Sequence, residues 1–283
     1  MKHLSERGGL IPSIAFALFA LILSFSATSA EAINGGVPDI YEHPNVGLMG
    51  VFLDGAPVGA CTATLIGKEV VLTAAHCIEN ALTFGTFPDK VTVMVSFDAD
   101  PVSDPASTDW KYVSELIPHP DYFWGPTSNP YDIGLLILAD EVEGIPPATL
   151  PEKGFLTNLK KAGELSHGRD RTHFTVVGFG ITLDWPSPEY DLTPQPRQQV
   201  ESGYRSLLKV WLNLSQNAAT EDGGSCFGDS GGPVFWKDTD GNETLVGITS
   251  WGDPHCVSPS FNYRVDLAES LDFIYTRLEQ GGD

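Results

Sequence analysis

The chain is poor in basic residues, in cysteine and in long apolar stretches. It has 16 Lys and Arg against 37 Asp and Glu, a net charge of −21. Proteins that bind nucleic acid need a basic surface, so this balance argues against nucleic acid as a partner. There are only four cysteines and no C-x-x-C pair, which makes a zinc site unexpected. Beyond the N-terminal region no apolar run is long enough to span a membrane, and no internal repeat is evident.

One apolar run lies near the N-terminus, at residues 10–25, after Lys2 and Arg7. Small residues follow it, ending in A-E-A at residues 30–32. This order is typical of a secretory signal peptide. A membrane anchor is the alternative, but a run of about 16 residues is short of the roughly 20 that a span needs. We expect residues 1–32 to be removed, the mature form to lack a membrane segment, and the protein to be secreted to the extracellular space or periplasm.

Short segments of strand character follow, separated by turns. Residues 90–97 (KVTVMVSF) alternate with period two, and residues 132–138 (DIGLLIL) read as a short buried strand. Asp-Gly at residues 54–55 and DTDGN at 238–242 are hairpin signals. Only residues 266–280 keep clear helical spacing, with a capping-box start at Asp266. The pattern predicts an all-β barrel or sandwich with a C-terminal helix.

Three motifs carry candidate catalytic residues: LTAAHC at 72–77, YDIGLL at 131–136 and GDSGGP at 228–233. A serine hydroxyl is a weak nucleophile that needs an adjacent base, and histidine can supply it. A buried carboxylate fixes the histidine tautomer and stabilises the imidazolium. Glycines around Ser230 let backbone N–H groups face a developing oxyanion. Together the motifs indicate acyl transfer.

GDSGG also fits the nucleophile elbow of α/β-hydrolases. Such an elbow leads from a strand into a helix, and the acid and then the histidine follow the serine along the chain. Here Gly-Gly-Pro and a hairpin follow Ser230, and His255 is the sole later histidine. The elbow is therefore disfavoured.

With these motifs the chain resembles the trypsin/chymotrypsin-like serine proteases over nearly all of residues 33–283. TAAHC, DIGLL and GDSGGP stand in the family's order, with S-W-G at 250–252 and Y-R-V at 263–265. The resemblance implies an all-β fold of two six-stranded antiparallel β-barrels, with the active site between them and a C-terminal α-helix. The expected divisions are an N-terminal barrel (33–145), a connection with the C-terminal barrel (146–265) and a terminal helix (266–280).

The resemblance also implies a role for each site residue. His76 would be the general base, Asp132 the residue that orients it, and Ser230 the nucleophile. The backbone N–H groups of Gly228 and Ser230 would form the oxyanion hole, and Ser250 would support Asp132. No cofactor is implied.

Four cysteines in an exported chain indicate two disulfides, and the residues alone leave three pairings open. The resemblance implies Cys61–Cys77 and Cys226–Cys256. The clustered Asp98, Asp100 and Asp104 fit no EF-hand spacing, so we expect no metal.

I-N-G-G at residues 33–36 resembles the family's activated N-terminus, whose ammonium pairs with the Asp before the nucleophile. Here Ile33 would pair with Asp229. Asn34 stands where Val is usual and is expected to weaken the packing of this segment. Cleavage after Ala32 would expose Ile33 directly, whereas cleavage after Ala30 would leave two blocking residues. We favour the first.

The family pattern places Gly224 at the floor of the specificity pocket, where a carboxylate would select Lys or Arg. Its absence disfavours trypsin-like specificity. The other substrate-binding candidates are Ser225, Phe227, Trp251, Gly252 and Ser260. They suggest a neutral, fairly open slot for a medium to large apolar or aromatic side chain at P1, the residue before the cleaved bond. Asp253 and His255 in the neighbouring loop are candidates for attracting charged side chains.

The leading prediction is a secreted, monomeric serine endopeptidase that cleaves proteins or peptides through a covalent acyl-enzyme, with protein inhibitors as further partners. The alternative from another class is a catalytically inactive, protease-like binding protein. Such proteins usually have a replaced triad residue, and His76, Asp132 and Ser230 are all present. An esterase using the same triad is a third candidate.

Overall fold

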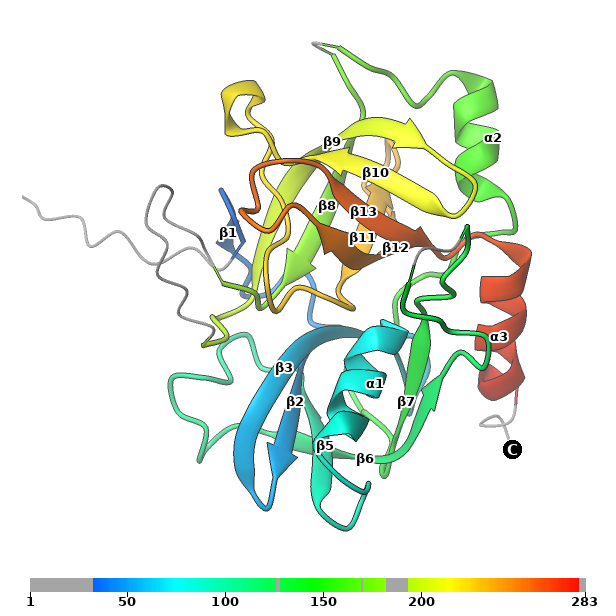
Figure 1. Cartoon of the computed structure of the whole chain (residues 1–283). Helices are drawn as coiled ribbons and strands as arrows, with labels where there is room; N and C mark the ends of the chain where they lie inside the picture. The colour runs from blue at the N-terminus through cyan, green and yellow to red at the C-terminus, as the bar shows by residue number, and fades with distance from the viewer. Residues whose placement is uncertain (1–32, 126–127, 169, 182–192, 280–283) are drawn as a thin grey trace, which may run out of the picture.

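The computed structural model describes residues 33–125, 128–168, 170–181 and 193–279 (Figure 1). The expected signal peptide, residues 1–32, lies outside the described residues. Two β-barrels pack against each other, and the short helices lie at their margins. The predicted all-β architecture with a C-terminal helix is confirmed.

Six antiparallel strands close the N-terminal barrel. Alternation of apolar residues along the strands builds its core: Val91, Val93 and Val95 are fully buried while the residues between them are partly exposed. The predicted Asp-Gly turn joins the first two strands, with Asp54 and Gly55 both at positive φ, as a tight hairpin requires. In ring order the strands are β2 (Val46–Leu53), β3 (Ala56–Leu65), β4 (Val70–Thr73), β7 (Gly134–Leu138), β6 (Trp110–Pro118) and β5 (Val91–Ser96).

The C-terminal barrel is also a ring of six antiparallel strands, closed by pairing between β8 and β9. A short strand, β1, adds to the outside of β9, so the first described residues join the second barrel although the first barrel follows them in sequence. The strands are β1 (Val37–Pro38), β9 (Gln198–Leu207), β10 (Trp211–Ser215), β13 (Ser260–Arg264), β12 (Glu243–Gly252), β11 (Pro233–Lys237) and β8 (His173–Gly178).

The described residues contain more helix than the sequence predicted. The terminal helix is present as α3 (Ala268–Leu278), and two other helices, α1 (Ala75–Thr83) and α2 (Phe155–Ala162), were missed. Each missed helix is short, and α2 buries only two leucines. A 3₁₀ turn, η1 (Ala218–Thr220), precedes the loop that carries Ser230.

The predicted capping box at Asp266 is wrong. The buried Asp266 carboxylate instead accepts a hydrogen bond from the backbone N–H of Leu156 at 3.0 Å, in the first turn of α2. It also pairs with Arg264 at 2.7 Å. Asp266 therefore satisfies the N-terminus of α2 rather than that of α3.

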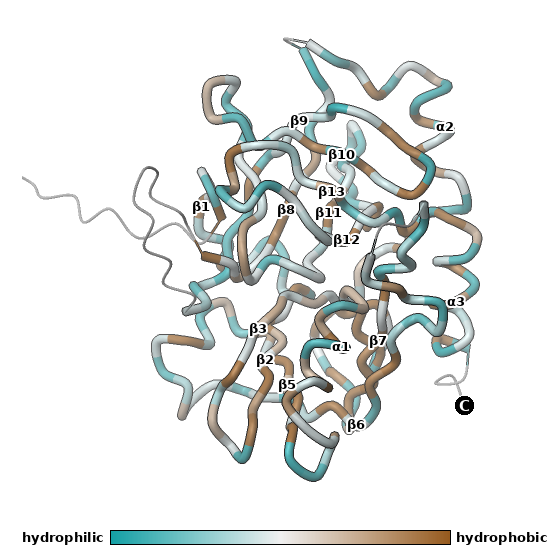
Figure 2. Tube along the Cα trace, viewed as in Figure 1, coloured by the Kyte–Doolittle hydropathy of each residue, from teal (hydrophilic) through white to brown (hydrophobic). Residues whose placement is uncertain are grey.

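Apolar residues concentrate along the strands of both barrels, and polar residues lie mostly on the loops (Figure 2). In the part of the chain that the structure describes, no helix is both long and apolar enough to cross a membrane.

Candidate active site

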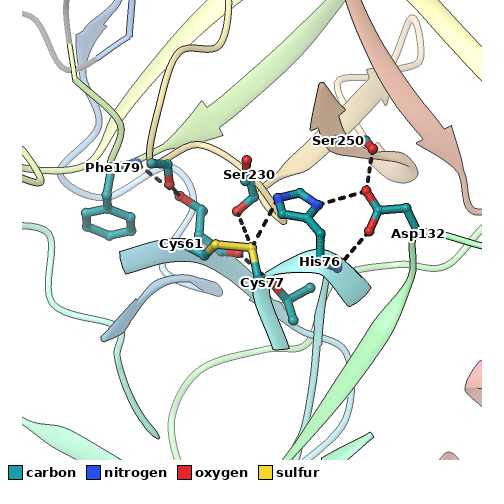
Figure 3. Close-up of a disulfide and its surroundings, with 10 residues drawn as sticks. Cys61, His76, Cys77, Asp132, Phe179, Ser230 and Ser250 are labelled. Carbon is teal, nitrogen blue, oxygen red and sulfur yellow. Dashed lines mark hydrogen bonds and ion pairs between the residues drawn. A yellow bond between two sulfur atoms is a disulfide. The ribbon is translucent and has the colours of Figure 1, made fainter. Parts of the chain in front are cut away.

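The candidate catalytic residues come from both barrels and meet between them (Figure 3). His76 lies in the first turn of α1, directly after β4, and Asp132 precedes β7. Ser230 precedes β11 in the second barrel. Its carbonyl accepts a hydrogen bond from the N–H of Thr62 in β3 at 2.8 Å, which joins the two barrels at the site.

Asp132 holds His76 by two hydrogen bonds. His76 Nδ1 lies 2.9 Å from Asp132 Oδ2, and the backbone N–H of His76 donates to Oδ1 at 2.9 Å. The Ser250 hydroxyl donates to Oδ2 as well. Asp132 is buried, which by itself opposes ionisation. The charge of His76 and these hydrogen bonds outweigh burial, so the pKa of Asp132 lies below its ordinary value.

The His76 ring lies between Asp132 and Ser230 (Figure 3). Among the described residues, its Nε2 contacts Cys77 Sγ at 3.7 Å, and the Ser230 hydroxyl makes no hydrogen bond. In unliganded sites a catalytic hydrogen bond is often long and tightens when substrate binds. The ring geometry therefore suits a base that engages the serine during reaction.

The loop before Ser230 exposes two donors. The backbone N–H groups of Gly228 and Ser230 donate to no acceptor within the described ranges. Gly228 has a φ of 98°, and a Cβ there would lie 2.9 Å from Gly180 Cα, so only glycine fits. Two free N–H groups beside a nucleophile are what an oxyanion hole requires.

Asp229 is fully buried between these donors. Its carboxylate accepts hydrogen bonds from the N–H groups of Gly180 at 2.7 Å and Cys226 at 2.8 Å. Burial nevertheless raises the pKa of Asp229 to about 7. No ion pair to Asp229 is present in the described part of the chain.

The expected pairing between Ile33 and Asp229 is not formed while residues 1–32 are attached. Ile33 is fully buried, and its nitrogen lies 3.4 Å from Gln198 Oε1. This nitrogen is a peptide amide while Ala32 is attached, so it carries no charge to offer a carboxylate.

We expected Asn34 to weaken the packing of this segment, but its polar groups are hydrogen-bonded. Its backbone exchanges two hydrogen bonds with Gly224, at 3.0 and 3.1 Å. Its side-chain amide donates to the Cys256 carbonyl at 2.7 Å, so the polar group is satisfied.

Both expected disulfides are present, Cys61–Cys77 and Cys226–Cys256. The first ties the helix that carries His76 to β3. The sulfurs of Cys61 and Cys77 also lie near His76, but atoms in a disulfide are not thiolates, so this group is not a metal site.

The pocket-floor candidates are brought together, but they do not leave an open slot. The side chain of Gln216, which sequence reasoning missed, lies against Gly224: a Cβ on that glycine would be 2.3 Å from Gln216 Cγ. The expectation of an open slot is therefore corrected, because a residue from the end of β10 occupies that space. Phe227 and Trp251 are 45% and 47% exposed. No motif marks Gln216; only the fold brings it to the floor.

Two cavities flank the site. One of about 730 Å³ reaches from His76 and Ser230 along an apolar wall that includes Phe52, Trp110 and Phe227. The other, of about 530 Å³, lies on the Asp132 and Ser250 side and is lined by aromatic residues. These residues are Tyr122, Phe123, Trp124, Trp211 and Trp251. Pro101, Val102 and Pro105 supply part of the first wall, and the segment from Tyr122 to Gly125 supplies part of the second.

Several known proteases are similar to the chain. It is 28% identical to the clotting factor G beta subunit of Tachypleus tridentatus, over 84% of this chain and 76% of that protein. It is 26% identical to chymotrypsin-like elastase family member 1 of Rattus norvegicus, over 80% and 81%. It is 28% identical to CLIP domain-containing serine protease B15 of Anopheles gambiae, of which it spans 61%.

A solved structure titled HL collagenase has the same fold, with a TM-score of 0.61 at 20% identity, over 89% of this chain and 98% of that one. The Trypsin family matches residues 41–274, which is most of the chain. The chain therefore belongs to the trypsin/chymotrypsin-like family of serine proteases.

Proposed function

We propose that this serine endopeptidase hydrolyses peptide bonds of protein or peptide substrates through Ser230, His76 and Asp132. The observation that carries the proposal is the fixed orientation of the His76 imidazole. Asp132 accepts hydrogen bonds from both the ring and the backbone N–H of His76, and the Ser250 hydroxyl donates to the same carboxylate. This arrangement fixes the proton on Nδ1 and leaves Nε2 free to act as a base.

The reaction follows from these positions. Nε2 of His76 takes the Ser230 proton as Oγ attacks the scissile carbonyl. The free N–H groups of Gly228 and Ser230 stabilise the negative oxygen of the tetrahedral intermediate. His76 then gives the proton to the leaving amine, and an acyl-enzyme remains on Ser230. Water, deprotonated by His76, releases the acid and restores the serine.

We further propose that removal of residues 1–32 activates the enzyme and accompanies secretion. The new ammonium of Ile33 would then pair with Asp229. Two observations support this. Asp229 is buried with a raised pKa, and the described residues place no cation beside it. The hydrogen bonds between Asn34 and Gly224 anchor the N-terminal segment to the neighbouring wall. A buried carboxylate of this kind needs a positive partner.

For P1 we propose an uncharged side chain, because the pocket floor is Gly224 and offers no carboxylate to a Lys or Arg. The sequence-based preference for a medium to large apolar or aromatic residue assumed an open slot, which Gln216 does not leave. Cleavage-site profiling on a mixed peptide library measures the P1 preference directly.

The function is tested by treating the secreted protein with a fluorophosphonate probe and the peptide library. We expect the probe to label Ser230 and the library to be cut, and we expect Ser230→Ala to abolish both. An inactive binding protein would behave like the Ser230→Ala variant. An esterase would be labelled and would cleave esters but not the matched amides.

A further inference from the structure

Gln216 lies between Gly224 and Gly252, which the family pattern places at the floor and on one wall of the specificity pocket. It follows the end of β10 and is only 1% exposed. A Cβ added to Gly224 would lie 2.3 Å from Gln216 Cγ and 2.5 Å from its Nε2. A Cβ added to Gly252 would lie 3.8 Å from its Oε1. The carboxamide therefore bridges the space between these two glycines.

The amide is held in one orientation. Its Nε2 donates to the backbone carbonyl of Ser225 at 2.5 Å, and the reverse orientation would place two oxygens against each other. Its Oε1 is buried and has no hydrogen-bond partner within the described residues. Because half of the amide is unsatisfied, packing between the walls rather than complete hydrogen bonding keeps it there.

The segments on either side of the amide are held by packing and by a disulfide. Ser260 is 2% exposed, and its Cα lies 3.4 Å from the position of a Cβ on Gly252. The Cys226–Cys256 disulfide links the segment after Gly224 to the loop after Gly252. The walls are thus covalently tied, and a large side chain entering between them would have to displace Gln216.

We propose that Gln216 closes the lower part of the pocket and restricts P1 to short, uncharged side chains such as Ala, Ser, Thr and Val. This inference rests on the proposed endopeptidase function and narrows its P1 preference. The ring of Phe or Tyr needs the volume that the carboxamide fills, and close-packed interiors do not absorb such a change without strain. A Lys or Arg would in addition bury a charge without a partner.

The test compares peptide substrates that differ only at P1, with Ala, Val, Leu or Phe, on the wild type and on Gln216→Ala and Gln216→Met. We expect the wild type to favour Ala over Phe by at least about tenfold in kcat/KM. Gln216→Ala removes the bulk and should raise the Phe-to-Ala ratio by about tenfold or more. Gln216→Met keeps the length without the amide and should hold the ratio within about threefold. A general loss of folding would scale both substrates equally and leave the ratio unchanged.

Equal cleavage after Phe and Ala by the wild type would overturn the inference. So would a Gln216→Met variant that shifts the ratio as far as Gln216→Ala, because the hydrogen bond to Ser225 would then be the cause. Fluorophosphonate labelling of Ser230 distinguishes a failure of this inference from a failure of the proposed function. A labelled enzyme that prefers Phe refutes only the role of Gln216. An unlabelled wild type that cleaves nothing refutes the proposed function, and this inference with it.

Discussion

At the residue scale, Asp229 is a buried carboxylate that has no cationic partner among the described residues while residues 1–32 are attached. It is fully buried, its pKa is raised to about 7 from an ordinary value of 3.8, and the described residues bring no cation to it. A carboxyl group whose folded pKa is raised binds its proton more tightly in the folded state than in the unfolded state. The contribution of Asp229 to stability is therefore fully present below about pH 4 and is lost as the pH rises from about 4 to 7.

We predict this decline for a chain that keeps Glu31 and Ala32 before Ile33, and its absence for a chain that begins at Ile33. An ammonium at Ile33 would favour the ionised carboxylate and remove the penalty. The measurement is the melting temperature between pH 4 and 7, where a difference of several degrees is expected. Asp229→Asn in the extended chain should flatten the curve. An identical profile in the extended chain and in the chain that begins at Ile33 would refute the pairing.

At the scale of elements, the loop that carries Ser230 is fixed by glycines that pack against the other barrel. Gly231 has a φ of 83°, and a Cβ there would lie 2.1 Å from Thr73 Oγ1 and 2.4 Å from the Thr62 carbonyl. Gly241, in the hairpin turn between β11 and β12, has nearly the same φ, 87°, but nothing lies within 4 Å of its Cβ position. An alanine at Gly241 therefore introduces backbone strain alone, whereas an alanine at Gly231 introduces both strain and steric overlap.

Gly241→Ala should cost only the strain of a left-handed residue, about 1–2 kcal/mol. Gly231→Ala should cost that strain and about 1–3 kcal/mol of overpacking. It should also slow labelling of Ser230, because the loop must shift away from Thr62. Urea unfolding and the labelling rate measure the two effects. Equal losses for the two variants would show that the contact between the barrels does not constrain this loop.

Sequence reasoning succeeded where local pattern determines structure. Alternation along β5, the Asp-Gly hairpin and the motifs around His76, Asp132 and Ser230 are local signals, and the structure brings the three side chains together. It failed where distant segments compete for one group. Asp266 had the spacing of a helix cap, yet Leu156 and Arg264 engage it. Gln216 has no motif, and its place depends on how β10 approaches both pocket walls.

At the scale of the whole molecule, His43 fastens the segment before the first barrel to the second barrel. Its ring is 3% exposed, with Nδ1 2.5 Å from Asp39 and Nε2 2.9 Å from Glu243 in β12. Burial alone lowers the pKa of His43, but the hydrogen bonds and charges of the two carboxylates outweigh it and raise the pKa to about 9. The folded state thus holds a proton that the unfolded state, near 6.5, binds less tightly.

The stability that His43 contributes is therefore complete below pH 6.5 and lost as the pH rises toward 9. His43→Gln should lower the free energy of unfolding by about 3 kcal/mol at pH 6, since it breaks a buried charged cluster. It should also reduce the fall in melting temperature between pH 6.5 and 9. His173→Gln, at a partly exposed ring, is the matched control. A His43→Gln variant with the wild-type slope would contradict this assignment.

The docking of residues 33–38 on the second barrel has a consequence for when the site can form during synthesis. The Ile33 nitrogen contacts Gln198, 165 residues further along the chain, and Asn34 pairs with Gly224 beyond that. A ribosome makes the first of these residues early and their partners late. The N-terminal segment therefore has no docking surface until most of the second barrel has been synthesised. Ser230 is synthesised later still. A nascent chain therefore lacks the proposed nucleophile, and cannot hydrolyse peptide bonds, until most of the protein has been made.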